Sequence, residues 1–177
     1  MKNFAFCAVI AAHLISCNQS TEQASDSENI SMPMPLELAS PMYRDVAKKC
    51  LMDLTEKNVD AFIEKFSDNA VYRFNNLDSL SGKELIRAYW EDRMTNVIER
   101  LEINDDVWLP IKVNQSENVR TGDWVLNWSR VKATYANGKS MTQLVHTVYH
   151  FDTEGKIDQV TQFVDQAPIM SALSENY

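Results

Sequence analysis

The sequence is poor in the residues that build several common kinds of functional site. It has three cysteines, four glycines, and 17 basic residues against 25 acidic ones. The glycines form neither a phosphate-binding loop nor a dinucleotide-binding fingerprint, and no serine stands in a nucleophile-elbow pattern. The net charge of −8 opposes binding to nucleic acid and to anionic lipid, because both need clustered Lys and Arg. We therefore expect no nucleic-acid partner and no cofactor.

The scarcity of cysteine excludes an internal disulfide framework. Cys7 lies in an N-terminal apolar segment, Cys17 follows that segment, and Cys50 is alone in the rest of the chain. A nucleophilic Cys50 needs a nearby histidine and an electropositive setting, and its neighbours in the sequence supply neither. Because Cys50 falls on the apolar side of a predicted helix, we expect it to pack in the core.

The N-terminal apolar run is too short to cross a membrane. Phe4 to Ile15 spans 12 residues, whereas a membrane-spanning helix needs roughly 18 to 20. Lys2 precedes the run, and Ser16 and Cys17 follow it, an order typical of a bacterial lipoprotein signal peptide. The alternatives are a buried N-terminal helix and a transmembrane anchor. A transmembrane anchor is usually followed by a basic flank, and none follows here. The pattern predicts cleavage before Cys17 and lipidation of that cysteine.

The signal predicts a place in the bacterial cell envelope, outside the cytoplasm and anchored to a membrane by lipid. Residues 17–40 are rich in Ser, Thr, Gln, Asn, Glu and Pro, a composition typical of a flexible tether. Asn18, in place of an aspartate after the lipidated cysteine, favours the outer membrane by the sorting rule of enteric bacteria. We expect residues 1–16 to be the signal peptide and residues 41–177 to form one domain.

Hydrophobic periodicity changes once along this domain. Residues 40–97 repeat apolar side chains at helical spacing in three segments, with a short strand before the third. Residues 100–166 alternate instead and predict four long strands, with Asn137-Gly138 as a type I′ hairpin turn. A short apolar segment, residues 167–173, is expected to close the domain. This order predicts an α+β fold in which three N-terminal helices pack on one face of an antiparallel sheet.

Four short stretches stand in a distinctive order along the domain. They are Thr55-Glu56-Lys57-Asn58-Val59-Asp60, Phe66-Ser67-Asp68-Asn69-Ala70-Val71, Ser81-Gly82-Lys83-Glu84 before Tyr89-Trp90, and Phe151-Asp152-Thr153-Glu154-Gly155-Lys156-Ile157 with Phe163-Val164-Asp165. This order resembles the nuclear-transport-factor-2-like superfamily and, within it, the SnoaL-like (polyketide-cyclase-like) group. The resemblance covers residues 42–173 and implies a cone-shaped fold, whose strongly bent sheet and three helices enclose a pocket.

The family contains both enzymes and non-catalytic binders, so single residues must decide the activity. In the steroid isomerase branch a tyrosine, an aspartate base and a protonated aspartate perform catalysis. The corresponding positions here are Cys50, Phe74 and Thr147, and this replacement excludes that isomerase activity.

Acid–base catalysis of a cyclase or dehydratase type has three candidates, Asp165, His146 and His150. Alternation along the strand places both histidines on one face and Thr147 on the other, and the resemblance implies that Thr147 faces the pocket. We therefore expect the histidines to point outward and Asp165 to cap the closing helix. The two histidines lie about 13 Å apart along a strand, so the sequence predicts no metal site.

Six residues are predicted to line the pocket and to contact a small, largely apolar ligand. They are Trp90, Trp128, Arg130, Thr147, Tyr149 and Gln162. An apolar cavity with a few polar groups is the usual pattern of a small-molecule site.

Three functions stay open at this point. The first is ligand binding without catalysis, and the second is a SnoaL-like enzyme with acid–base chemistry. The third is a homodimeric envelope module that associates through the outer sheet face, with Leu144, His146, Val148 and His150 at the interface.

Overall fold

The first helix begins where the sequence supplies a capping side chain. Ser40 accepts a hydrogen bond from the backbone nitrogen of Met42 at 3.3 Å, and Pro41 occupies the first helical position. The computed structural model describes residues 35–174. The predicted signal peptide, Cys17 and residues 18–34 of the predicted tether lie outside the described residues.

The described chain alternates between helices and strands before it enters the long strands. The elements are β1 (Leu36–Leu38), α1 (Pro41–Thr55), α2 (Val59–Ile63), β2 (Phe66–Phe74), β3 (Ser79–Ser81), α3 (Lys83–Asp92), a π-helical turn η1 (Arg93–Val97), β4 (Ile98–Val113), β5 (Gly122–Tyr135), β6 (Ser140–Phe151), β7 (Ile157–Phe163) and α4 (Gln166–Leu173). The predicted α+β class and the four long strands are confirmed. Three helices precede the long strands, but β2 and β3 separate α3 from the first two.

The strands of residues 35–174 join in one sheet of order β1-β4-β5-β6-β7-β2-β3. Strands β4 to β7 run antiparallel, whereas β2 pairs with β7 in parallel. The expectation of an antiparallel sheet throughout was therefore wrong. Alternation along a single strand does not encode its direction, and the long connection from β2 to β7 allows both strands to run the same way.

The start of the folded region also differs from the sequence prediction. Residues 36–38, assigned to the tether, form β1 and pair with residues 111–113 of β4. All three residues of β1 are exposed, so the strand is held by backbone pairing and leaves no burial pattern in the sequence.

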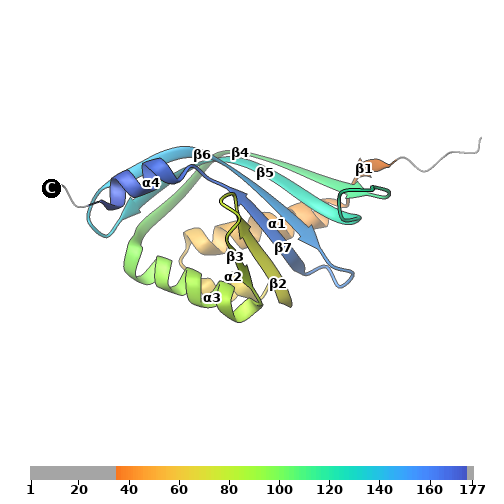
Figure 1. The fold of residues 1–177 in the computed structure, drawn as a ribbon, viewed down its shortest axis with the longest axis horizontal. Helices are drawn as coiled ribbons and strands as arrows, with labels where there is room; N and C mark the ends of the chain where they lie inside the picture. The colour runs from red at the N-terminus through yellow and green to blue at the C-terminus, as the bar shows by residue number, and fades with distance from the viewer. Residues whose placement is uncertain (1–34, 175–177) are drawn as a thin grey trace, which may run out of the picture. The chain divides into compact units, whose positions relative to one another are not determined.

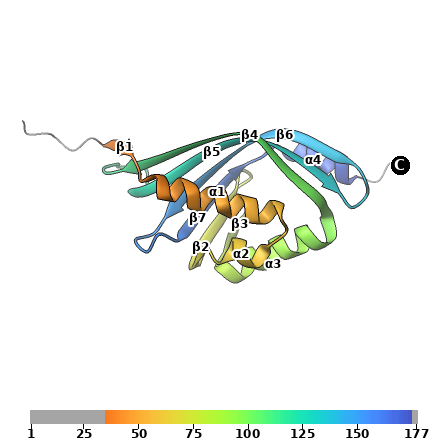
Figure 2. The ribbon, with the colours of Figure 1, turned by 180° about the vertical axis from the view of Figure 1, so that it is seen from behind.

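Helices α1, α2 and α3 lie beneath the sheet, whose long strands arch over them (Figures 1 and 2). Helix α1 contacts β4 and β5, α3 contacts β2, and α4 packs against β6 near the other end of the sheet. None of the helices formed by residues 35–174 combines the length and the apolar composition that crossing a bilayer requires.

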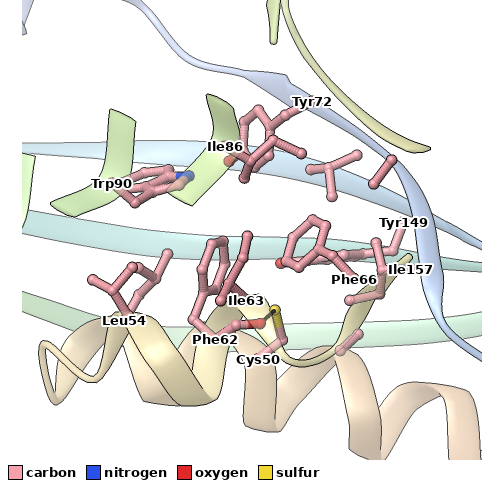
Figure 3. Packing of buried hydrophobic residues seen from close by; sticks show 14 of the residues in the cluster. Cys50, Leu54, Phe62, Ile63, Phe66, Tyr72, Ile86, Trp90, Tyr149 and Ile157 are labelled. Atoms are coloured by element: carbon pink, nitrogen blue, oxygen red, sulfur yellow. Dashed lines mark hydrogen bonds between the residues drawn. The ribbon is translucent and has the colours of Figure 1, made fainter. Parts of the chain in front are cut away.

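The main core fills the space between the helices and the inner sheet face (Figure 3). Cys50 is buried there with its Sγ 3.9 Å from the carbonyl oxygen of Phe62, and burial raises the pKa of its thiol far above the ordinary value. The predicted core position of Cys50 is confirmed. Asp53 is also buried and accepts hydrogen bonds from Lys49 and Lys65. Burial raises the pKa of the Asp53 carboxyl, but the two lysines outweigh this effect and hold it below its usual value.

Candidate ligand-binding cavity

A bulge in β4 decides which of its side chains face the helices. Asp105 has a φ of +51°, and the pairing of β4 with β5 shifts by one residue between Asn104 and Val107. Alternation reverses at a bulge. Trp108 therefore turns inward, where its ring stacks on Tyr149 with centroids 6.2 Å apart, and Val107 is exposed. Uninterrupted alternation would place the odd-numbered apolar residues of β4 on one face along its whole length, and the bulge breaks this pattern.

The inner sheet face and the helices enclose a cavity of about 140 Å³. Engineered cavities of roughly this size hold a molecule as large as benzene. Aliphatic side chains from α1, η1, α4 and the long strands form much of the wall, together with an aromatic group. The aromatic lining residues are Phe62, Tyr72, Phe74, Tyr89, Trp90, Tyr135 and Tyr149.

Trp90, on α3, anchors this aromatic wall (Figure 3). Its ring meets those of Phe62, Tyr72 and Tyr89 edge-on, at centroid distances of 6.0, 5.9 and 5.3 Å. Contacts of this kind contribute about 0.5–1.5 kcal/mol each beyond simple burial. The indole Nε1 is buried and has no hydrogen-bond acceptor among residues 35–174.

Neutral polar groups provide the hydrogen-bonding capacity of the cavity interior. Thr147 on β6 and Gln162 on β7 are directly opposite one another across the two strands, and both line the cavity. Burial raises the pKa of Tyr72 and of Tyr149 well above the ordinary tyrosine value. Both phenols therefore stay protonated and uncharged at neutral pH, and can donate hydrogen bonds.

The lining residues differ in exposure, and the more exposed ones mark the rim of the cavity. Trp90 and Tyr149 are buried, Arg93 is half-buried and Gln166 is exposed. The guanidinium carbon of Arg93 lies 5.1 Å from the centroid of the Tyr89 ring. Arg93 occupies η1, a π-helical turn, which is a feature often found at functional sites.

Four of the six predicted pocket residues line the cavity, namely Trp90, Thr147, Tyr149 and Gln162. Trp128 and Arg130 do not. Trp128 pairs with His146 and shares the outer face with it, and the Nε of Arg130 bonds to Asp105 at 2.8 Å.

The turn between β5 and β6 explains why these two residues were misplaced. A type I′ turn at Asn137-Gly138 requires a positive φ at both residues, but only Gly138 has one, at +79°. The loop instead contains three residues, because the Tyr135 nitrogen donates to the Lys139 carbonyl oxygen at 2.8 Å. One extra turn residue shifts the register by one and moves β5 side chains to the opposite face.

The three acid–base candidates lie away from the cavity. His146 stacks between Trp128 and Phe163 on the outer face, with centroid distances of 4.7 and 5.5 Å. Asp165 caps α4 by accepting a hydrogen bond from the Ala167 nitrogen at 2.9 Å.

His150 is buried on the outer side of the sheet. Its Nδ1 lies 2.5 Å from an Asp158 carboxylate oxygen, and its Nε2 lies 3.0 Å from the Thr121 carbonyl oxygen. Among residues 35–174, the side chains that line the cavity include no carboxylate, imidazole or thiol. No three His, Cys, Asp or Glu residues in this part of the chain gather as a metal site requires.

Arg93, Tyr72 and Tyr89 are cavity residues that the sequence analysis did not select. The alternation of residues 70–74 offered a signal for Tyr72, because it predicts a strand with one buried face. Tyr89 shares the helical apolar spacing of residues 40–97, which indicates burial but does not by itself indicate a place in the pocket wall. Arg93 stands in a segment whose apolar residues keep helical spacing up to residue 97, and a single charged residue in such a segment is typical of a solvent-exposed position, so no sequence signal marked it.

Comparisons with known proteins agree on the fold. The sequence model of the SnoaL-like domain matches residues 50–160. A candidate polyketide cyclase from Xanthomonas campestris has a similar structure, with 13% identity, a TM-score of 0.60, and coverage of 75% of this chain and 96% of that one. An LEH-like epoxide hydrolase from Mycobacterium tuberculosis has 14% identity and a TM-score of 0.55, covering 74% and 88%.

A third structure, the epoxide hydrolase/cyclase-like enzyme SalBIII of pyran ring formation in salinomycin, has 20% identity and a TM-score of 0.56. It covers 72% of this chain and 93% of its own. No curated protein matches the sequence. At these identities the structural likeness establishes the fold and not the chemistry.

Proposed function

The chain belongs to the SnoaL-like domain family, and we propose that it binds a small, largely apolar molecule in its internal cavity without acid–base catalysis. The observation that carries this proposal is the composition of the cavity wall. Aromatic and aliphatic side chains dominate it, and Thr147, Gln162 and the tyrosine hydroxyls add neutral polar contacts. This combination is typical of sites that bind small molecules.

An enzyme of the cyclase, dehydratase or epoxide hydrolase type is the alternative suggested by the structural neighbours. General acid–base catalysis needs a group that exchanges protons near neutral pH within hydrogen-bond reach of the substrate. Asp165, His146 and His150 are engaged elsewhere, and the pKa values of Tyr72 and Tyr149 are raised away from neutrality. The cavity residues therefore favour binding over proton transfer.

Native mass spectrometry of the purified protein tests the binding proposal. We expect an additional, releasable mass compared with the denatured protein. Tyr149→Phe, which removes a hydroxyl from the wall, should reduce the occupied fraction, whereas Arg130→Ala on the outer face should not. A mass without adduct, together with no binding of a small probe such as 1-hexanol, would contradict the proposal.

We also propose that the protein is a lipid-anchored component of the bacterial cell envelope. Support comes from the sequence alone: the basic Lys2, the short apolar run and Ser16-Cys17. The expected result is incorporation of labelled palmitate in the wild type and none in Cys17→Ser, with the variant lost from the membrane fraction. Equal labelling of the two proteins would show that Cys17 is not the lipidated residue.

A second candidate function is self-association through the outer sheet face. Trp128 is 43% exposed and Phe163 is 47% exposed, and their rings stack on either side of His146. Val107 and Leu144 extend this apolar surface and are also exposed. Contiguous apolar surface of this kind is typical of interaction sites, and we propose a second copy of the chain as the partner.

Sedimentation velocity measures this association directly. We expect the wild type to be a dimer and Trp128→Glu to be a monomer, because the substitution buries a charge at the interface. Leu77→Glu is the matched control, since Leu77 is 92% exposed in the loop between β2 and β3. A monomeric wild type at high concentration would refute self-association.

A further inference from the structure

We infer that the ligand carries one anionic group, a carboxylate, which binds Arg93 at the rim while the apolar body of the ligand fills the cavity. This inference rests on the proposed binding function and adds the chemical class of the ligand. The starting observation is that Arg93 is the single charged side chain among the described residues that line the cavity.

Arg93 has no ion-pair partner among residues 35–174. Arg87, on the preceding helix α3, is different because it bonds to Asp60 and lies 3.4 Å from Glu91. The whole chain has 25 acidic and 17 basic residues, so acidic side chains are abundant. No acidic side chain among residues 35–174 forms an ion pair with this half-buried arginine, which leaves a local positive charge at the rim of the cavity.

The surroundings of Arg93 favour a carboxylate over a neutral polar group. Its guanidinium lies over the Tyr89 ring, an arrangement that restricts the side chain while leaving its N–H groups available. The guanidinium fork matches the two oxygens of a carboxylate, and such charge-assisted bonds are roughly twice as strong as neutral ones. Burial raises the pKa of Tyr135 and the charge of Arg93 lowers it, so this phenol lies close enough to feel that charge.

The size of the cavity limits the body of the ligand. A volume of about 140 Å³ suits a body on the order of six to eight non-hydrogen atoms. The wall around this volume is aromatic and aliphatic, so the body must be apolar. Short-chain and aromatic monocarboxylates such as hexanoate and benzoate have both features.

Isothermal titration calorimetry with a charged and a neutral probe of equal chain length tests this assignment. We expect the wild-type protein to bind hexanoate roughly tenfold more tightly than 1-hexanol, because only hexanoate forms a charge-assisted bond. Arg93→Gln should remove this preference and leave the affinity for 1-hexanol unchanged. Arg87→Gln is the matched control, since it removes a cation from α3 that does not line the cavity, and the preference should persist.

The two probes also separate failure of this inference from failure of the proposed function. Equal affinity of the wild type for hexanoate and 1-hexanol would overturn the anionic ligand and leave the apolar cavity intact. Binding of neither probe would overturn both proposals. The comparison between probes uses only the wild-type protein, so it decides the question even if Arg93→Gln does not fold.

Discussion

Filling the cavity with a larger side chain tests whether it is an accessible space that takes up a ligand. Ala133 on β5 lines the cavity and is only 2% exposed. In Ala133→Leu three additional carbon atoms are buried, a gain of roughly 2.4 kcal/mol at about 0.8 kcal/mol per methylene. Crowding in a packed core costs about 1–3 kcal/mol, so the two effects nearly cancel. We expect a free energy of unfolding within about 1 kcal/mol of the wild type.

Ala70→Leu is the matched control for this experiment. Ala70 is completely buried in the core on β2 but does not line the cavity. The same three carbon atoms find no space there, and we expect a loss of about 1–3 kcal/mol or more. Urea unfolding, followed by circular dichroism, gives both free energies.

Ligand affinity supplies the second measurement on the same variants. Ala133→Leu should abolish binding of 1-hexanol, because the leucine occupies the space of the ligand body, whereas folded Ala70→Leu should still bind it. Equal destabilisation by the two substitutions would mean that Ala133 faces a filled core. Retained binding in Ala133→Leu would mean that the ligand binds elsewhere.

Two further substitutions test buried polar and backbone features. Asp53 has a lowered pKa, so its contribution to stability is present above the unfolded value of about 4 and is lost as the pH falls through the folded value. Asp53→Asn should therefore lower the free energy of unfolding by roughly 1.5–3 kcal/mol at pH 7. Urea unfolding at several pH values should also show a smaller loss of stability at acid pH in the variant than in the wild type. The same pH dependence in both proteins would contradict this. In Gly122→Ala the new Cβ meets the Nε2 of His150 at 2.9 Å, at a φ of +118°, and we expect a loss of about 1–3 kcal/mol. Gly138→Ala is the control, because its new Cβ meets nothing within 4 Å at a φ of +79°, and we expect it to lose only about 1–2 kcal/mol in the same assay. A larger loss of stability in Gly138→Ala than in Gly122→Ala would contradict the predicted clash with His150.

The element order was predictable because burial leaves a period in the sequence. The helices present apolar residues to the sheet at helical spacing, and the four long strands alternate. Ser40 before Pro41 is a capping signal that can be read from the sequence, and α1 begins there. The parallel pairing of β2 with β7 and the exposed strand β1 were not predictable in this way, since strand direction and solvent-exposed backbone pairing leave no hydrophobic signature.

The cavity wall was predictable only where the strand register did not matter. Thr147, Tyr149 and Gln162 were placed correctly, because alternation within β6 and within β7 decides which face each of them occupies. Trp128 and Arg130 depended on the length of the turn that connects β5 with β6. The glycine pattern favoured a two-residue turn, whereas the chain forms a three-residue one, and a single residue decides between the two faces of a sheet.

The placement of the arginines has a consequence for how a ligand enters. If Arg130 faced the cavity, the sheet would supply a positive charge to the ligand. Arg130 instead pairs with Asp105 on the outer side of the sheet. Among residues 35–174, the cationic side chain that lines the cavity is Arg93, in the π-helical turn at the rim. A carboxylate held there remains close to water, which avoids the large cost of burying a charge. The apolar body therefore enters first, toward Trp90 and Tyr149, and the charged group stays at the rim beside η1.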